Sequence, residues 1–409
     1  MDSTANNKFI LPDGFNYSCV EGCGLCCQDW NIDINPETYE NLSGINWVEI
    51  SDKFSGRKIF LESETGGKRF ENVENKCIFL DADNSCIIHK HLGYDAKSLT
   101  CKRYPLNFMK TPAGINVRLS FVCPSIIKNT GKPLNELIEY IEYVFRAAES
   151  KYYSLSEPVF LDEDTSVSWD EYTRIEAALI KTLDSQGNYE DALRAGAKLL
   201  RYISSAKNNG LEVSDILKSA GEKSFFEARA ETNLIKRRLY LSIFATNELV
   251  GQSKKTALQR YLSAFNILLG RGSISIKGTE ADISKANKIK FNIENGNVSG
   301  QIKRYIRHLI STKWYLIPVV KLNPQGTNLK SGYSFILIIY ALIRWYSKIF
   351  AAQRGGDEVG QDDIEKAISA VEKNYAGHVS RDTLFLNNKR FAQISNILIM
   401  QEYFEETII

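Results

Sequence analysis

The sequence predicts an α+β protein, mostly α, in which a small cysteine-rich N-terminal domain with short strands precedes a large helical domain. All eight cysteines of the 409-residue chain lie between Cys19 and Cys123. Residues up to about 125 are irregular, whereas apolar residues beyond 130 recur at the helical period. We therefore expect a cysteine-rich metal-binding domain over residues 1–130. A helical domain over residues 131–409 is expected to shape a protein-substrate site.

Short alternating segments predict the strands of the N-terminal part. Residues 31–35, 68–70 and 78–80 have this pattern. Gly66-Gly67 and the polar run from Asp81 to Ser85 predict turns. With so few regular elements, the hydrophobic core is thin, and a metal site would supply part of the folding free energy.

Amphipathic stripes predict the helices of the second part, the first of which begins after Pro133. Helices are predicted over residues 134–145, 169–183, 192–203, 225–250, 255–269, 331–352 and 362–374. Pro318 and Pro324 predict a break in the helical pattern. The polar residues 270–297 predict a hairpin or a loop.

Composition excludes several functional classes. The formal net charge is +2 and the pI is about 8.0, so nothing indicates the concentrated basic face of a nucleic-acid-binding protein. The longest apolar run, Phe335 to Ile343, is much shorter than the ~20 residues of a transmembrane helix, which predicts a core helix and no transmembrane segment. The first residues have neither a basic nor an apolar signal region, which predicts a cytoplasmic protein.

The cysteine spacing indicates a metal centre. In a reducing cytosol, clustered cysteines favour metal binding or catalysis over disulfides. Cys19-x3-Cys23-x2-Cys26 places three thiolates on one tight loop that could wrap one face of a 4Fe-4S cluster. Such a cluster would keep one iron for a fourth cysteine or a small molecule.

The remaining cysteines leave the number of centres open. They are Cys27, Cys77, Cys86, Cys101 and Cys123. Eight thiols suit two four-cysteine sites, one cluster with one zinc, or one cluster with spare cysteines. His89 and His91 follow Cys86 and could be ligands, although histidines in this position are more often surface groups.

The cysteine motifs resemble those of a known family. Cys19-x3-Cys23-x2-Cys26-Cys27, the segment from Cys77 to Cys86 and the segment from Cys101 to Pro105 resemble the CxxCxxCC family of zinc- or iron-chelating proteins. Residues 26–30, CCQDW, together with 32–34 resemble its flagellin lysine-N-methylase branch. This resemblance covers about the first 125 residues and implies methyl transfer from S-adenosylmethionine to flagellin lysines, with an iron–sulfur cluster required.

The location of the cofactor follows from what the chain lacks. Gly270-Arg-Gly272 follows a predicted helix rather than a strand, unlike the glycine-rich loop of a Rossmann-type methyltransferase. We therefore expect S-adenosylmethionine to bind at or near the cluster, with Arg103 and Tyr104 as candidate contacts. Polar transfer would need a deprotonated lysine, whose ordinary pKa is about 10.4. A radical route would need an electron from the cluster.

Two other functional classes stay open. The chain could be a non-catalytic zinc- or iron-binding module with a partner-docking helical domain, or an iron–sulfur oxidoreductase.

Trp30 could shield the cluster from water or support the cofactor. The aromatic residues of the helical part could pack in the core or form a lysine-binding cage. They are Trp314, Tyr315, Tyr333, Tyr340, Trp345 and Tyr346. The sequence indicates no oligomeric state.

Overall fold

The chain divides into two compact units. The computed structural model describes residues 8–28, 30–63, 66–147, 152–185, 188–221, 234–245, 257–276, 279–292, 294, 296–316, 328–376 and 408. The cysteine unit comprises Asp13–Phe108 and Val117–Tyr152 and contains every cysteine. The helical unit comprises Met1–Pro12, Met109–Asn116 and Tyr153–Ile409. The domain boundary near residue 130 stays a prediction.

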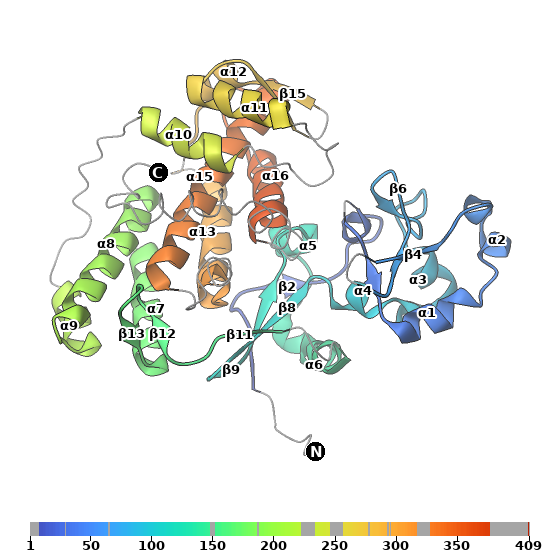
Figure 1. The fold of residues 1–409 in the computed structure, drawn as a ribbon, viewed down its shortest axis with the longest axis horizontal. Helices are drawn as coiled ribbons and strands as arrows, with labels where there is room; N and C mark the ends of the chain where they lie inside the picture. Colours follow the sequence, from blue (N-terminus) through green and yellow to red (C-terminus); the bar gives the residue numbers. More distant parts are fainter. Residues whose placement is uncertain are drawn as a thin grey trace. The chain divides into compact units, whose positions relative to one another are not determined.

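The cysteine unit consists of short elements (Figure 1). Its strands are β2 (Asn16–Tyr17), β3 (Asp33–Ile34), β4 (Phe60–Glu62), β5 (Lys68–Phe70), β6 (Asn72–Val73), β7 (Lys76–Cys77) and β10 (Lys132–Pro133). Its helices are η1 (Leu25–Cys27), α1 (Pro36–Ser43), α2 (Trp47–Ile50), η2 (Asp52–Phe54), α3 (Ile87–Leu92), η3 (Tyr94–Ala96), α4 (Leu99–Arg103), α5 (Pro124–Lys128), η4 (Leu134–Leu137) and α6 (Ile138–Ala147). The strands form three small antiparallel sheets, β3-β5-β4, β6-β7 and β2-β10.

Aromatic side chains form the core of this unit. The ring of Phe79 lies 4.7 Å from that of Trp47 and 4.9 Å from that of Phe70, both edge to face. Phe54 completes the group at 5.5 Å from Phe79. These four rings are almost fully buried, and the surrounding segments with little regular structure are anchored on them.

A four-stranded sheet was not predicted from the sequence. Strands β8 (Leu106–Thr111) and β9 (Gly114–Leu119) lie at its centre, and the division between the two units runs through both. Strand β1 (Phe9–Ile10) pairs with β9, and β11 (Tyr153–Ser154) pairs with β8, both in parallel. The resulting order is β1-β9-β8-β11.

The helical unit is built around its longest helix, α15 (Leu329–Gln353), against which α8, α10, α12, α13 and α16 pack. Its helices are α7 (Trp169–Leu183), α8 (Tyr189–Asn208), α9 (Val213–Gly221), α10 (Leu234–Phe244), α11 (Ala257–Leu269), α12 (Ile283–Lys288), α13 (Gly296–Ser311), η5 (Trp314–Leu316), α15, α16 (Gln361–Val371) and the π-helical η6 (Glu372–Ala376). Two hairpins, β12 (Val159–Phe160) with β13 (Ser166–Val167) and β14 (Ser273–Ile276) with β15 (Thr279–Asp282), complete it.

The fold class predicted from the sequence is confirmed, since the described chain is mostly helical with short strands. Helix α7 has the predicted bounds because Ser168 and Glu171 form a capping box at its start. The predicted hairpin within 270–297 is β14–β15, with α12 after it. Residues 225–233, 246–250 and 255–256, and Pro318 and Pro324, lie outside the described residues.

Some elements were wrong or missed. Ile78–Leu80 is not a strand, because the backbone turns there: the Leu80 amide donates to the Cys77 carbonyl at 2.9 Å. All three of its side chains are buried, so a short apolar run resembled a strand. Helices α9 and α13 were missed, the second because its start at Gly296 lies in a glycine- and asparagine-rich segment.

Among the described residues, α15 alone is long and apolar enough to cross a membrane. Most of it is buried inside the protein, as the prediction of a core helix requires.

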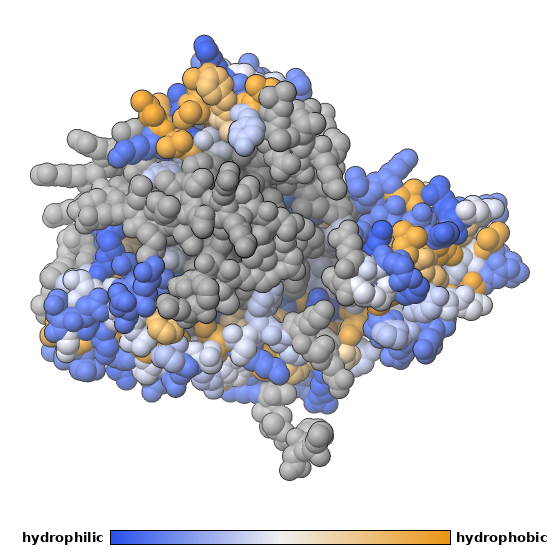
Figure 2. All heavy atoms as spheres, in the orientation of Figure 1, coloured by the Kyte–Doolittle hydropathy of each residue, from blue (hydrophilic) through white to orange (hydrophobic). Residues whose placement is uncertain are grey.

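Helices α10 and α11 pack together and expose apolar side chains, seen as orange spheres over this region in Figure 2. The exposed residues are Leu234, Ile235, Leu239, Tyr261, Leu262, Phe265 and Leu269.

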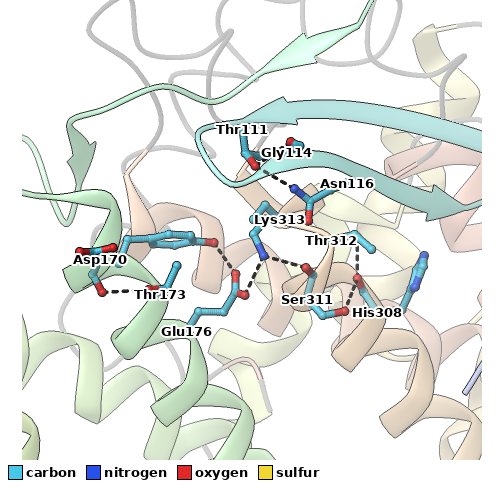
Figure 3. A network of polar contacts seen from close by, with 11 residues as sticks. Thr111, Gly114, Asn116, Asp170, Thr173, Glu176, His308, Ser311, Thr312 and Lys313 are labelled. Atoms are coloured by element: carbon cyan, nitrogen blue, oxygen red, sulfur yellow. Dashed lines mark hydrogen bonds and ion pairs between the residues drawn. The ribbon is translucent and has the colours of Figure 1, made fainter. Parts of the chain in front are cut away.

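A buried ion pair connects α7 to the segment after α13 (Figure 3). The Lys313 ammonium donates to the Glu176 carboxylate at 2.8 Å, and the Tyr172 hydroxyl donates to the other oxygen at 2.5 Å. Both charged side chains are about nine-tenths buried. Burial raises the pKa of Glu176, although Lys313 and Tyr172 oppose that rise.

We expect Lys313→Met to destabilise the helical unit by about 3–5 kcal/mol at neutral pH, because the buried charge of Glu176 would lose its cationic partner and keep only the Tyr172 hydroxyl. The loss should grow as the pH rises above 4.5, the ordinary pKa of this carboxyl, since its pKa in the folded variant is raised further. Urea unfolding at several pH values measures this effect. The matched control is Arg307→Met, whose half-exposed pair with Asp184 should contribute at most about 1 kcal/mol. Equal losses in both variants would contradict the prediction.

Candidate metal centre

The cysteine loop turns tightly before η1. Gly24 has a φ of 55°, and a Cβ atom there would lie 2.9 Å from the Leu80 side chain and 3.2 Å from the Asn84 carbonyl. The loop therefore lies directly against the turn at residues 81–85, and glycine is required for this approach. The Trp30 indole donates to the Cys26 carbonyl at 2.8 Å, which holds the end of the loop.

Four neighbouring segments bring five cysteines into one packed cluster. Cys27 and Cys77 are buried within the aromatic core of the unit. Cys26, Cys86 and Cys101 are half-buried and pack against the same cluster. Cys77 ends β7, Cys86 precedes α3 and Cys101 lies on α4, so three short elements position them.

Cys19 and Cys123 come together through a different set of contacts. β2 pairs with β10, and the Ser18 amide donates to the Ser125 hydroxyl at 3.2 Å. Helix α5, which begins directly after Cys123, lies against β2 (Figure 1). The residue before Cys19 is thus joined to the second residue after Cys123, although the two segments are more than a hundred residues apart.

All eight cysteines are free thiols in the structure. The pKa of Cys101 is raised to about 11 and that of Cys123 to about 12, chiefly by burial and in part by neighbouring cysteines. The pKa of Cys26 is instead lowered to about 7, chiefly because it shares a hydrogen bond with Cys27. A bound cation would stabilise the ionised form of thiols with a raised pKa, such as Cys101 and Cys123, because it coordinates the thiolates and displaces their protons.

Two residues missed in the sequence support these thiols. The Ser98 hydroxyl caps α4, accepting from the Cys101 amide at 3.2 Å and donating to the Cys101 sulfur at 3.1 Å. Burial lowers the pKa of the Lys97 ammonium, but four neighbouring cysteines together raise it more, so the net shift is upward; they are Cys101, Cys86, Cys26 and Cys27. The Ser-x-x-Cys spacing of a helix cap could have revealed Ser98, whereas no local pattern marks Lys97.

Tyr104 has a buried hydroxyl that fits a bound group. Its oxygen has no hydrogen-bond partner in the described part of the chain, although a buried polar atom ordinarily has one. Its ring lies 5.5 Å from that of Trp30. Burial raises the pKa of this hydroxyl, and Cys123, Cys26 and Cys23 raise it further, which places it amid three thiols. Arg103 ends α4 beside it and is half-buried.

The thiols do not already surround a single ion. In the described chain, no three Cys, His, Asp or Glu side chains converge closely enough to hold a single metal ion. Zinc with bonds of about 2.3 Å needs sulfurs roughly 3.8 Å apart, and the Cys26 and Cys27 sulfurs, at 3.7 Å, meet that need. Ligands of an iron–sulfur cluster stand farther apart, because the inorganic core lies between them.

Other candidate residues have ordinary roles in the structure. His89 and His91 are exposed on α3, and the His89 ring lies 5.8 Å from that of Tyr94. The six aromatic residues considered for a lysine cage are all buried in the helical unit, as the core interpretation predicts. Gly270 and Gly272 follow α11 and precede β14, so they do not form a strand–loop–helix nucleotide site.

Comparison with known proteins confirms the predicted resemblance. Residues 18–123 match the CxxCxxCC family model, described as "Putative zinc- or iron-chelating domain". Over 114 residues the chain is 26% identical to the flagellar biosynthetic protein FliU of Salmonella muenchen, which covers 27% of this chain and 66% of that protein.

Two lysine-N-methylases show the same similarity. They come from Salmonella typhimurium strain LT2 and Salmonella choleraesuis strain SC-B67, each 26% identical over 114 residues. The match spans 27% of this chain and only 28% of the length of either methylase. No solved structure matches the chain.

We expect Gly131→Ala to loosen the pairing of β2 with β10. A Cβ atom on Gly131 would lie 2.4 Å from the Ser18 amide nitrogen, and its φ of 112° is unfavourable for other residues. The matched control is Gly14→Ala, where φ is 74° but no atom lies within 4 Å. Gly131→Ala should cost about 1–3 kcal/mol more than the control in urea unfolding, because only it overpacks the backbone. Equal costs would show that this contact is not tight.

Proposed function

We propose that the chain is a protein-lysine N-methyltransferase that uses S-adenosylmethionine and requires an iron–sulfur cluster held by its N-terminal cysteines. One observation carries the proposal: the similarity to lysine-N-methylases lies in the N-terminal part of the chain, which also contains all eight free thiols. The name of one relative, a flagellar biosynthetic protein, supports flagellin as the substrate. Methylation would then take place in the cytoplasm, before the substrate is exported.

The residues present fit an iron–sulfur group. The eight cysteines supply more thiolates than one cluster needs, and the Tyr104 hydroxyl supplies a buried donor that has no partner among the described residues. When bound, such a cluster supplies an electron or an open iron site to a sulfonium cofactor. Our proposal places S-adenosylmethionine beside this centre, with Arg103 and Tyr104 as its contacts.

Side chains around the thiols would prepare the site. The Lys97 ammonium would balance part of the thiolate charge, since Cys101 and Cys86 already raise its pKa. The Trp30 and Tyr104 rings, which lie against each other, would exclude water from the cysteine loop. A target lysine must lose its proton for a polar transfer, and a site without water would lower its pKa.

The helical unit would receive the protein substrate. Its exposed apolar side chains on α10 and α11 provide contact area for a partner. Monomeric proteins rarely expose a large contiguous patch of such side chains. The aromatic residues of its core are already engaged: Tyr333 donates to the Leu193 carbonyl and Tyr340 to the Glu190 carboxylate. The target lysine would therefore be bound elsewhere.

A second candidate function is a non-catalytic metal-binding module with a docking domain. It is favoured by the extent of the match, which covers 27% of the chain, in its N-terminal part, and leaves most of the helical unit outside the similarity to the methylases. It is also favoured by the 3.7 Å separation of the Cys26 and Cys27 sulfurs, which suits one zinc ion.

We expect the anaerobically reconstituted protein to add methyl groups to flagellin lysines when it is supplied with labelled S-adenosylmethionine, and mass spectrometry of lysine peptides measures the gain. Cys23→Ser should abolish the gain and reduce the iron content, because a ligand is lost. Its matched control is Glu21→Gln, an exposed change in the same loop that leaves every thiol in place. No methyl gain with iron and sulfide at full content would favour the binding module.

A further inference from the structure

We infer that the eight cysteines form two separate metal centres, and that the adjacent Cys26 and Cys27 belong to different ones. A core centre takes Cys27, Cys77, Cys86 and Cys101. A loop centre takes Cys19, Cys23, Cys26 and Cys123. The inference rests on the proposed function only in taking the cysteines as ligands of a thiophilic metal group, either a zinc ion or an iron–sulfur cluster.

Packing defines the core centre. The residues next to Cys27 and Cys77, Gln28 and Lys76, form an antiparallel bridge, which brings these two cysteines side by side. A second bridge, between Leu80 and Cys86, returns the chain to the same place after the turn at 81–85. Cys101 packs against the same hydrophobic cluster from α4. Four thiols from four segments of the chain therefore pack into or against one core, and Cys26 packs against it as well.

A separate scaffold defines the loop centre. Cys19 and Cys123 are not part of that hydrophobic cluster. They are joined by the pairing of β2 with β10, the bond from Ser18 to Ser125, and the edge-to-face contact of Phe15 with Phe121 at 5.9 Å. Cys23 lies in the same loop as Cys19, one turn earlier than η1.

The electrostatic neighbours divide in nearly the same way. Cys27 interacts most strongly with Cys26 and then with Cys77 and Cys101, and Cys77 interacts with Cys101 and Cys86. Cys123 interacts instead with Cys23 and Cys19. The packing of the chain therefore carries the division, and the charges agree with it except at Cys26.

Cys26 lies at the junction of the two groups. Its sulfur is 3.7 Å from that of Cys27 and it also interacts with Cys101, but it is the strongest cysteine neighbour of Cys19. It is half-buried, whereas Cys27 is enclosed in the core. Assigning Cys26 to the loop centre gives each centre four thiolates, the number that both tetrahedral zinc and an iron–sulfur cluster take.

The two centres differ in access to solvent. Cys27 and Cys77 are buried among aromatic rings, which suits a closed structural site. Cys19 is exposed, and the unpartnered Tyr104 hydroxyl lies amid Cys23, Cys26 and Cys123. Solvent or a cofactor can therefore approach the loop centre, for example to take an electron from it, although four thiolates leave it no open coordination position. The core centre maintains the fold.

Metal content of single variants tests the inference. Protein purified without oxygen is analysed for iron, zinc and acid-labile sulfide per chain, which also tells a zinc ion from a cluster. We expect Cys123→Ser to lose the metal of one centre and to keep that of the other in full. Cys86→Ser should show the converse loss, and the double variant should lose both. Glu21→Gln, which leaves every thiol in place, is the matched control and should keep the full content.

The outcomes separate the possibilities. Loss of all metal in Cys123→Ser, with an unchanged circular dichroism spectrum, would show a single shared centre and overturn the inference. Full metal in Cys123→Ser would show a spare cysteine and also overturn it. If Cys86→Ser does not fold, Cys123→Ser and the wild-type protein decide: a thiol-competitive chelator should remove wild-type metal in two phases but Cys123→Ser metal in one. Two filled centres without methyl transfer would contradict the proposed function and leave this inference standing.

Discussion

Ionising the neighbouring thiols of the cysteine unit together costs free energy, which a bound cation would offset. Each buried cysteine raises the pKa of its neighbours, and burial raises it further, as at Cys101 and Cys123. The surrounding segments offer little else to hold them in place, because the strands of this unit are two or three residues long. A metal group that binds the thiolates would therefore stabilise the charges and the fold at the same time.

The helical unit depends on ordinary packing instead. Its longest helix, α15, is buried along most of its length, and the helices against it need no metal to form a core. One costly feature is the buried pair of Glu176 and Lys313, which is satisfied by Tyr172 and by the Ser311 carbonyl. The two units thus have different sources of stability, and loss of metal should unfold the first before it affects the second.

Sequence patterns predicted the features that are set by residues close together in the sequence. Helix α7 was predicted to the residue because its periodicity and its capping box agree. The cysteine motifs were recognised because ligands on one loop have a characteristic spacing. The grouping of the eight thiols could not be predicted, because it depends on β2 meeting β10, more than a hundred residues away. Likewise, nothing near Tyr104 in the sequence indicates that its hydroxyl is buried without a partner.

The pairing of β2 with β10 also sets an order of events during synthesis. Cys19 leaves the ribosome well before Cys123, because it lies far earlier in the sequence. The hydrogen bond that joins Asn16 to Asn129, next to these cysteines, closes a span of 113 residues and can form only when both ends have been made. The thiols from Cys27 to Cys101 are complete earlier, and their aromatic core can form while the rest of the chain is still being made. Cys19 and Cys23 must wait as exposed thiols until α5 and β10 emerge, and in that interval the nascent chain is most open to oxidation and most accessible to a metal donor.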